Sequence, residues 1–155
     1  MIVAIDGPAA SGKSTTAKMV AKKLKMTYVD TGAMYRAVTL ALLRSNTDLD
    51  DYDSVCKVVD ELVLDIYDQG ANTVVRLDGE DVSQAIRSMP VTKNVSAVSA
   101  VKYVREAMVK IQRNIGKKTN CVVEGRDIGT VVFPDAEFKI FMVADDKMRA
   151  ERRLK

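Results

Sequence analysis

The chain has 155 residues, of which 47% are hydrophobic and 29% are charged, and it contains no histidine. One domain per roughly 150 residues is usual, so this length and composition predict a single globular unit of soluble type. The lack of histidine excludes Ser-His-Asp and Cys-His catalysis, histidine-ligated zinc and an imidazole proton shuttle. A net charge of +3 demands no nucleic-acid or membrane partner and is compatible with small anionic ligands.

The cysteines and the amino terminus bear on the compartment. Cys56 and Cys121 have no CxxC spacing, which excludes a thiolate zinc or redox motif and predicts small core residues in a reducing environment. The apolar start of the chain meets a charge at Asp6, and no apolar run approaches the roughly 20 residues of a membrane span. We therefore expect a cytoplasmic protein.

The first third of the sequence predicts a βαβα order. Ile2–Asp6 is β-branched and stops at Gly7-Pro8, and helical 3–4 spacing begins at Lys13. A second short strand is expected at Thr27–Val29 and a second helix at Ala33–Arg44. This order implies right-handed crossovers and a parallel sheet flanked by helices.

The middle of the sequence predicts a third helix at Asp48–Leu62, capped by Asp50 or Asp51. Short apolar runs with hairpin signals between them then predict a small antiparallel insert within residues 63–88. The runs are Val63–Tyr67, Thr73–Leu77 and Asp81-Val82, and the signals are Gly70-Ala71-Asn72 and Asp78-Gly79.

The last part returns to the first pattern. Pro90 opens a helical segment, and a long amphipathic helix follows that Gly116 is expected to end. Two more core strands are expected at Cys121–Val123 and Phe138–Val143, before a charged helix at Asp146–Lys155.

A phosphate-binding P-loop pattern lies between the first strand and the first helix. Glycines let successive backbone N–H groups face phosphate oxygens, Lys13 reaches the β and γ phosphates, and the Ser14 hydroxyl ligates Mg²⁺. The structural alternative is an ordinary glycine-containing turn before a helix. The expected ATP phosphate contacts in the loop are Gly7, Pro8, Ala9, Ala10, Ser11, Gly12, Lys13, Ser14 and Thr15.

Ligands of open parallel sheets bind beyond the carboxyl ends of the strands, and two of these ends are polar: Asp30-Thr31 and Glu124–Asp127. Thr31 either caps the second helix or binds a ligand, and the two roles are compatible. Arg36 alone is typical of a solvated helix charge, but together with Arg126 it predicts a guanidinium clamp on a phosphate.

Glu124 follows an apolar strand, which predicts a ligand for Mg²⁺, with a structural salt bridge as the alternative. Asp127 has an alternative role as the cap of the segment Ile128–Phe133. Arg105 flanks the apolar stripe of its helix, which indicates a partly buried charge with a specific partner. Spacing alone assigns nothing to Ser96.

Four segments resemble the bacterial cytidylate kinase family of nucleoside monophosphate kinases, which phosphorylate CMP and dCMP from ATP. The segments are Ile5–Ser14, Tyr28–Arg36, Leu77–Val82 and Glu124–Ala136. The similarity runs in order from Ile2 to Arg153, and the stretch Gly125–Val132 is far more specific than a P-loop. It implies an α/β P-loop kinase fold, with the small antiparallel insert on the monophosphate side, and Mg²⁺ bound with ATP.

The resemblance also implies one domain over residues 1–155. Its core would be residues 1–62 and 117–145, its insert and helices residues 63–116, and the start of a lid residues 146–155. The family's carboxyl-terminal part, with the rest of the lid and a last strand and helix, is not in this sequence. ATP and CMP or dCMP are the implied partners of a monomer, without nucleic acid or membrane.

Individual roles carry over by position. Lys13, Arg36 and Arg126 would be catalytic, and Arg152 matches a lid arginine that closes over ATP. The implied CMP-binding residues are Asp30, Thr31, Tyr35, Arg36, Ser96, Arg105, Gly125, Arg126 and Asp127, and those of Mg²⁺ are Ser14 and Glu124.

Two other functions remain open at this point. A P-loop kinase for a hydroxyl-bearing metabolite would use Asp30 to accept the alcohol proton. A nucleotide-binding module would keep the P-loop without transferring phosphate.

Overall fold

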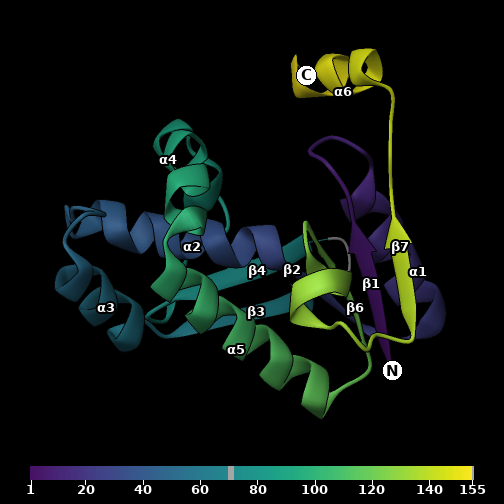
Figure 1. The fold of residues 1–155 in the computed structure, drawn as a ribbon, viewed down its shortest axis with the longest axis horizontal. Coiled ribbons are helices and arrows are strands. Elements are labelled where there is room, and N and C mark those ends of the chain that lie inside the picture. The colour runs from purple at the N-terminus through teal and green to yellow at the C-terminus, as the bar shows by residue number, and fades with distance from the viewer. Residues whose placement is uncertain (70–71, 155) are drawn as a thin grey trace. The chain divides into compact units, whose positions relative to one another are not determined.

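The computed structural model describes residues 1–69 and 72–154. These form two compact units, one made of Met1–Thr31 and Gln112–Lys155 and the other of Gly32–Ile111. Each unit has its own sheet (Figure 1). Each also has its own cluster of buried apolar side chains. The expected division of the chain at residues 62 and 116 stays a prediction.

The first unit contains a four-stranded parallel sheet in the order β2-β6-β1-β7. Its strands are β1 (Ile2–Asp6), β2 (Thr27–Asp30), β6 (Cys121–Gly125) and β7 (Phe138–Phe141). Figure 1 shows β1 in purple beside β7 in yellow, which fits their pairing from Val3↔Phe138 to Asp6↔Phe141. The α/β class and the parallel sheet predicted from the sequence are confirmed.

Helix α1 (Lys13–Leu24) packs on this sheet through small side chains. Ala17 and Ala21 are buried against Val3, Ile5 and Val122 in one apolar cluster. These small residues let the helix lie close to the strands. Burial of the cluster from water holds α1 on the sheet, so that the helix begins just beyond the end of β1. The first unit also holds the π-helical turn η2 (Ile128–Val132) and the terminal helix α6 (Asp146–Leu154).

The second unit has a three-stranded antiparallel sheet in the order β3-β4-β5. The strands are β3 (Leu64–Gln69), β4 (Asn72–Leu77) and β5 (Glu80–Asp81). Asp78 and Gly79 join β4 to β5 with φ values of 52° and 84°, the left-handed pair that a two-residue hairpin turn needs. The predicted antiparallel insert is confirmed, and its signal at residues 70–71 lies outside the described residues.

Helices complete the second unit. They are α2 (Thr31–Arg44), α3 (Tyr52–Glu61), the short η1 (Ala85–Arg87), α4 (Met89–Ala100) and α5 (Lys102–Lys118). Both α2 and α5 have residues in the two units, α2 through Thr31 alone. Ala33, Ala37 and Leu40 of α2 are buried with Val75 and Leu77 of β4. The apolar face of α2 is therefore matched to the antiparallel sheet.

Several predicted boundaries are wrong in informative ways. The third helix begins at Tyr52 rather than at Asp48, because Asp51 caps it by accepting a 3.2 Å hydrogen bond from the Ser54 N–H. The second helix begins at Thr31 rather than Ala33, and the last strand ends at Phe141 rather than Val143.

Gly116 does not end the long helix, which continues to Lys118. A Cβ at Gly116 would lie 2.7 Å from the ring of Phe133. Glycine at position 116 therefore allows the helix to lie close to the ring, and it does not form a left-handed helix end. In residues 1–69 and 72–154, none of the helices combines the length and apolar character needed to cross a membrane.

Candidate nucleotide-binding site

The carboxyl ends of the parallel strands meet at one edge of the first unit's sheet. β1 ends at Asp6, β2 at Asp30 and β6 at Gly125, and each strand end is followed by a segment that carries predicted site residues. Because the strands are parallel, these segments share the edge at which open α/β sheets bind ligands.

The loop between β1 and α1 has the backbone of a phosphate-binding turn. Ala10 and Gly12 have φ values of 60° and 96°, and Gly7 has φ 149°. A Cβ at Gly7 would collide with the carbonyl oxygen of Met142, so only glycine fits there. Ser11 has a buried hydroxyl for which the described residues provide no hydrogen-bond partner. An unsatisfied hydroxyl inside the loop fits a ligand rich in oxygen atoms.

Lys13 lies at the start of α1, and its ammonium donates a 3.0 Å hydrogen bond to the Pro8 carbonyl, which folds it over the loop. Partial burial lowers the pKa of Lys13 from its ordinary value, while the nearby carboxylates of Glu124, Asp30 and Asp6 act in the opposite direction. A half-desolvated cation among acidic strand ends is suited to receiving the negative charge of phosphates.

Glu124 is the most deeply buried acidic side chain of this edge, with 4% of its surface exposed. Its Oε2 accepts a 2.9 Å hydrogen bond from the Ser14 hydroxyl, and its Oε1 accepts one from the Tyr28 hydroxyl. Burial raises the pKa of Glu124, and the two hydroxyl donors partly offset that effect. Both oxygens are thus held by hydroxyl groups, an arrangement different from the salt bridge considered as the alternative.

Ser14 and Glu124 together present the hard oxygen ligands that Mg²⁺ prefers. Among the described residues, no three acidic or cysteine side chains gather into a complete cation site. Mg²⁺ is usually bound by one or two protein ligands together with substrate phosphates, so this pair fits a magnesium ion that arrives with a nucleotide.

Thr31 and Gly125 bring the ends of β2 and β6 into contact. The Thr31 hydroxyl donates a 2.7 Å hydrogen bond to the Glu124 carbonyl. A Cβ at Gly125 would lie 2.8 Å from the Thr31 Oγ1 and 2.6 Å from Ile128, so this position has no room for a side chain. The sequence singled out both residues, but it did not indicate this contact between them.

Asp127 precedes η2, but its side chain makes no capping hydrogen bond. The alternative in which its carboxylate caps the segment Ile128–Phe133 is therefore wrong. Its carbonyl instead accepts a 2.8 Å hydrogen bond from the Val131 N–H, and its carboxylate is half-buried.

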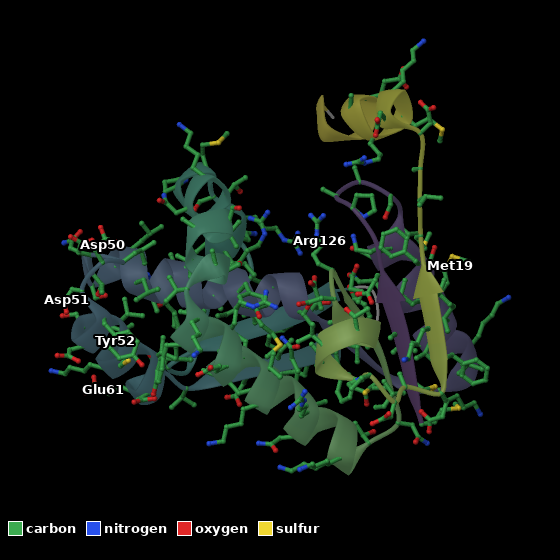
Figure 2. The ribbon with its side chains drawn as sticks, viewed as in Figure 1. Met19, Asp50, Asp51, Tyr52, Glu61 and Arg126 are labelled. Carbon is green, nitrogen blue, oxygen red and sulfur yellow. The ribbon has the colours of Figure 1, made fainter. Side chains whose placement is uncertain are left out.

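Arg126 is exposed at the same edge, where β6 ends, and is labelled in Figure 2. It lines a pocket of about 470 Å³ together with loop residues and part of α6. The other lining residues are Gly7, Pro8, Phe141, Val143, Ala144, Asp146 and Arg149. Arg126 therefore lines the same pocket as Gly7 and Pro8 of the phosphate loop.

Arg149 is a site residue that the sequence reasoning missed. Its Nε donates a 3.1 Å hydrogen bond to the Ala9 carbonyl of the phosphate loop, and its Nη1 forms a 2.7 Å ion pair with Asp146. Arg149 lies in a run of charged residues, and nothing in the sequence distinguishes it from its neighbours there. It lies three residues before Arg152, which is about one helical turn away. The Arg152 side chain lies outside the described residues.

The other predicted residues lie mainly in the second unit. Arg36 is half-buried on α2, and its Nη1 donates hydrogen bonds of 3.2 Å to the Ile86 carbonyl and 2.9 Å to the Thr92 hydroxyl. Tyr35 on α2 and Arg105 on α5 are half-buried as well, and Ser96 on α4 is exposed. A clamp of Arg36 with Arg126 joins residues of both units and stays a prediction.

A central parallel strand that leads through this loop into a helix, with Lys13 and Ser14 at the helix start, defines a P-loop protein. A family model described as cytidylate kinase matches residues 3–155, and the chain belongs to the cytidylate kinase family.

Named relatives agree with this assignment. The chain is 52% identical over 158 residues to a cytidylate kinase of Chloroherpeton thalassium, an alignment that covers 99% of this chain and 65% of the relative. It is 53% identical over 153 residues to one of Chlorobaculum tepidum, with 99% and 65% covered. A cytidylate kinase of Bacillus thuringiensis is 51% identical over 152 residues, with 97% and 67% covered. The chain thus spans about two thirds of the length of these curated relatives.

Proposed function

We propose that the full-length protein transfers the γ-phosphoryl group of ATP to CMP or dCMP, forming ADP and CDP or dCDP. The observation that carries this proposal is the Ser14 hydroxyl bonded to the buried Glu124 carboxylate at the foot of the phosphate loop. Family membership supports the choice of acceptor, since the relatives are cytidylate kinases. In this proposal the enzyme acts in the cytoplasm as a monomer, in pyrimidine nucleotide metabolism.

Phosphoryl transfer to a nucleoside monophosphate requires positioning of the reactants and neutralisation of charge, and it does not require a strong base. The attacking group of a nucleoside monophosphate is a phosphate oxygen that is already ionised, which suits a chain without histidine. Lys13 places its charge on the β and γ phosphates of ATP. Ser14 and Glu124 would hold Mg²⁺, which when bound neutralises phosphate charge. Arg36 and Arg126 would bind the phosphate of the acceptor.

The remaining assignments extend this division of the site. Residues 7–15 and Arg152 would bind the ATP phosphates. Arg149 would bind them as well, because its hydrogen bond to the Ala9 carbonyl holds it at the phosphate loop. The proposed CMP contacts are Asp30, Thr31, Tyr35, Arg36, Ser96, Arg105, Gly125, Arg126 and Asp127.

A coupled assay of ADP release by the full-length protein tests the proposal, with CMP, dCMP, UMP, AMP and shikimate as acceptors. We expect fast turnover with CMP and dCMP and much slower turnover with the others. A preference for shikimate would support a kinase for hydroxyl-bearing metabolites. ATP binding without product from any acceptor would support a nucleotide-binding module.

A further inference from the structure

Asp6 is a buried carboxylate to which none of the nucleotide contacts above assigns a role. It ends β1, directly before the first residue of the phosphate loop, and only 7% of its surface is exposed. Its Oδ1 accepts a 2.8 Å hydrogen bond from the Ile128 N–H, and its Oδ2 accepts one of the same length from the Gly129 N–H. One side chain therefore binds two consecutive amides that lie 122 and 123 positions away.

These two amides open η2, and the first N–H groups of a helical turn have no partner within it. The preceding residue, Asp127, does not supply one, since its side chain makes no capping bond. Asp6 fills this role from a neighbouring strand. Hydrogen bonds to an ionised acceptor are about twice as strong as neutral ones, so the pair of bonds holds the start of η2 firmly.

The segment between β6 and η2 is fixed from both ends by the same residue. Asp6 lies opposite Gly125 in the β1–β6 pairing, and its side chain holds Ile128 and Gly129. Arg126 and Asp127 are the two residues between these attachments. Their backbone has little freedom to shift along the sheet edge.

Asp6 also fixes the phosphate loop. Its carbonyl accepts a 2.7 Å hydrogen bond from the Met142 N–H, and the next residue, Gly7, lies so close to Met142 that a Cβ would collide with it. The loop therefore starts from a residue that is bonded on one side to Met142, directly after β7, and on the other to η2.

We propose that Asp6 is a positioning residue that keeps Arg126 and Asp127 in register with the phosphate loop. The acceptor phosphate is then bound at a set distance from the ATP phosphates, which is the alignment that phosphoryl transfer requires. This inference rests on the proposed function, because it takes Arg126 and Asp127 as contacts of CMP.

The first test replaces Asp6 in the full-length protein. Asp6→Asn keeps the shape of the side chain but replaces one of its two acceptor oxygens by an NH₂ group. This NH₂ group then faces the N–H of Ile128 or Gly129, and two donors oppose each other. Calorimetry should show CMP affinity falling about tenfold or more, while the affinity of a non-hydrolysable ATP analogue stays within about twofold. Asp135→Asn, at an exposed carboxylate after η2, is the matched control and should change neither. Equal losses for both ligands, or no loss, would overturn the inference.

A second variant pair tests the route of the effect. If Asp6 acts through the Arg126 segment, Asp6→Asn should weaken CMP binding much less in an Arg126→Ala background than in the wild type. The same fold loss in both backgrounds would show that Asp6 acts elsewhere and would contradict the proposal.

Two further measurements keep the test decisive if Asp6→Asn folds poorly. Asp6→Glu keeps the charge and both acceptors but moves them by one methylene, and it should lower CMP affinity more than ATP-analogue affinity. In the wild-type protein, amide hydrogen exchange should be slow at Ile128 and Gly129, and exchange at the rate of unprotected backbone would refute the proposed contact. A wild-type protein that binds the ATP analogue but no CMP would refute the proposed function itself, and this inference with it.

Discussion

The hydroxyl of Ser14 donates a 2.9 Å hydrogen bond to the buried carboxylate of Glu124, across 110 positions of sequence. This bond ties the start of α1 to the end of β6. It places a hydroxyl and a carboxylate side by side under the phosphate loop, as two ligands of one magnesium ion would be.

Tyr28→Phe removes the second hydrogen bond to Glu124 while keeping the ring that packs with the core of the first unit. A buried carboxylate oxygen then lacks a donor, which costs about 1–3 kcal/mol. We expect the free energy of unfolding in urea to fall by that amount. Tyr67→Phe, at an exposed tyrosine of β3, is the control and should have little effect. Equal stability of the Tyr28→Phe variant and the wild type would show that Tyr28 does not support Glu124.

Glu124→Gln should change the pH dependence of stability. Burial raises the pKa of Glu124 above the ordinary value of 4.5, so the folded protein holds this proton more tightly than the unfolded chain. Glu124 therefore stabilises the wild type at low pH. This stabilisation is lost as the pH rises from 4.5 through the pKa of Glu124 in the folded protein. Glutamine does not titrate, so the variant should become more stable relative to the wild type across this window.

Urea denaturation of both proteins at a series of pH values, without nucleotide or Mg²⁺, measures this effect. Curves of unfolding free energy that stay parallel with pH would contradict a raised pKa at Glu124.

Gly116→Ala tests the contact between α5 and Phe133. Alanine favours a helix by about 1 kcal/mol over glycine, but overpacking costs about 1–3 kcal/mol, and a Cβ 2.7 Å from an aromatic ring forces a shift. We expect a net loss of stability in thermal melting. In a Phe133→Leu background the ring is gone and the Ile2 Cδ1, 3.0 Å from the added Cβ, remains, so Gly116→Ala should cost less stability there. Destabilisation of equal size in both backgrounds would show that the ring is not the cause.

In the proposed function Asp127, Ser96 and Arg105 are contacts of CMP, and Asp127→Asn tests whether Asp127 distinguishes cytosine from uracil. An ionised carboxylate only accepts hydrogen bonds, so it fits the cytosine amino group and opposes the uracil carbonyl. The asparagine amide also donates, and we expect the ratio of kcat/KM for CMP over UMP to narrow, mainly through a lower value for CMP. Because the Asp127 side chain does not cap η2, the loss of a helix cap would not explain a narrower ratio. An unaltered ratio would leave base recognition to other residues, with Ser96 and Arg105 the next to replace.

The sequence was sufficient where the signal is local. The phosphate loop follows from the spacing of Gly7, Gly12 and Lys13, and the parallel sheet follows from the alternation of short strands with amphipathic helices. The Asp78-Gly79 hairpin was predicted from two adjacent residues, and both have the left-handed backbone that this turn requires. In each case the residues that determine the structure lie within a few positions of one another.

The sequence was insufficient where the determining contact joins distant segments. Asp6 binds the amides of Ile128 and Gly129, and backbone amides leave no trace in residue type. A glycine late in a helical pattern is typical of a helix end, but Gly116 is required because the Phe133 ring leaves no room for a Cβ. Arg149 lies in a charged run in which its bond to the phosphate loop has no local signature. These contacts became visible only once the strands had brought the segments together.

The most direct measurement is the formation of CDP by the full-length protein, followed by phosphorus NMR with ATP, CMP and Mg²⁺. We expect the wild type to form CDP and ADP in equal amounts. We also expect Lys13→Ala to abolish transfer while melting at the wild-type temperature, because this ammonium is half-solvated in the chain alone and acts on the phosphates in the complex. CDP formation at the wild-type rate by a well-folded Lys13→Ala variant, or no CDP from the wild type, would contradict the proposed function.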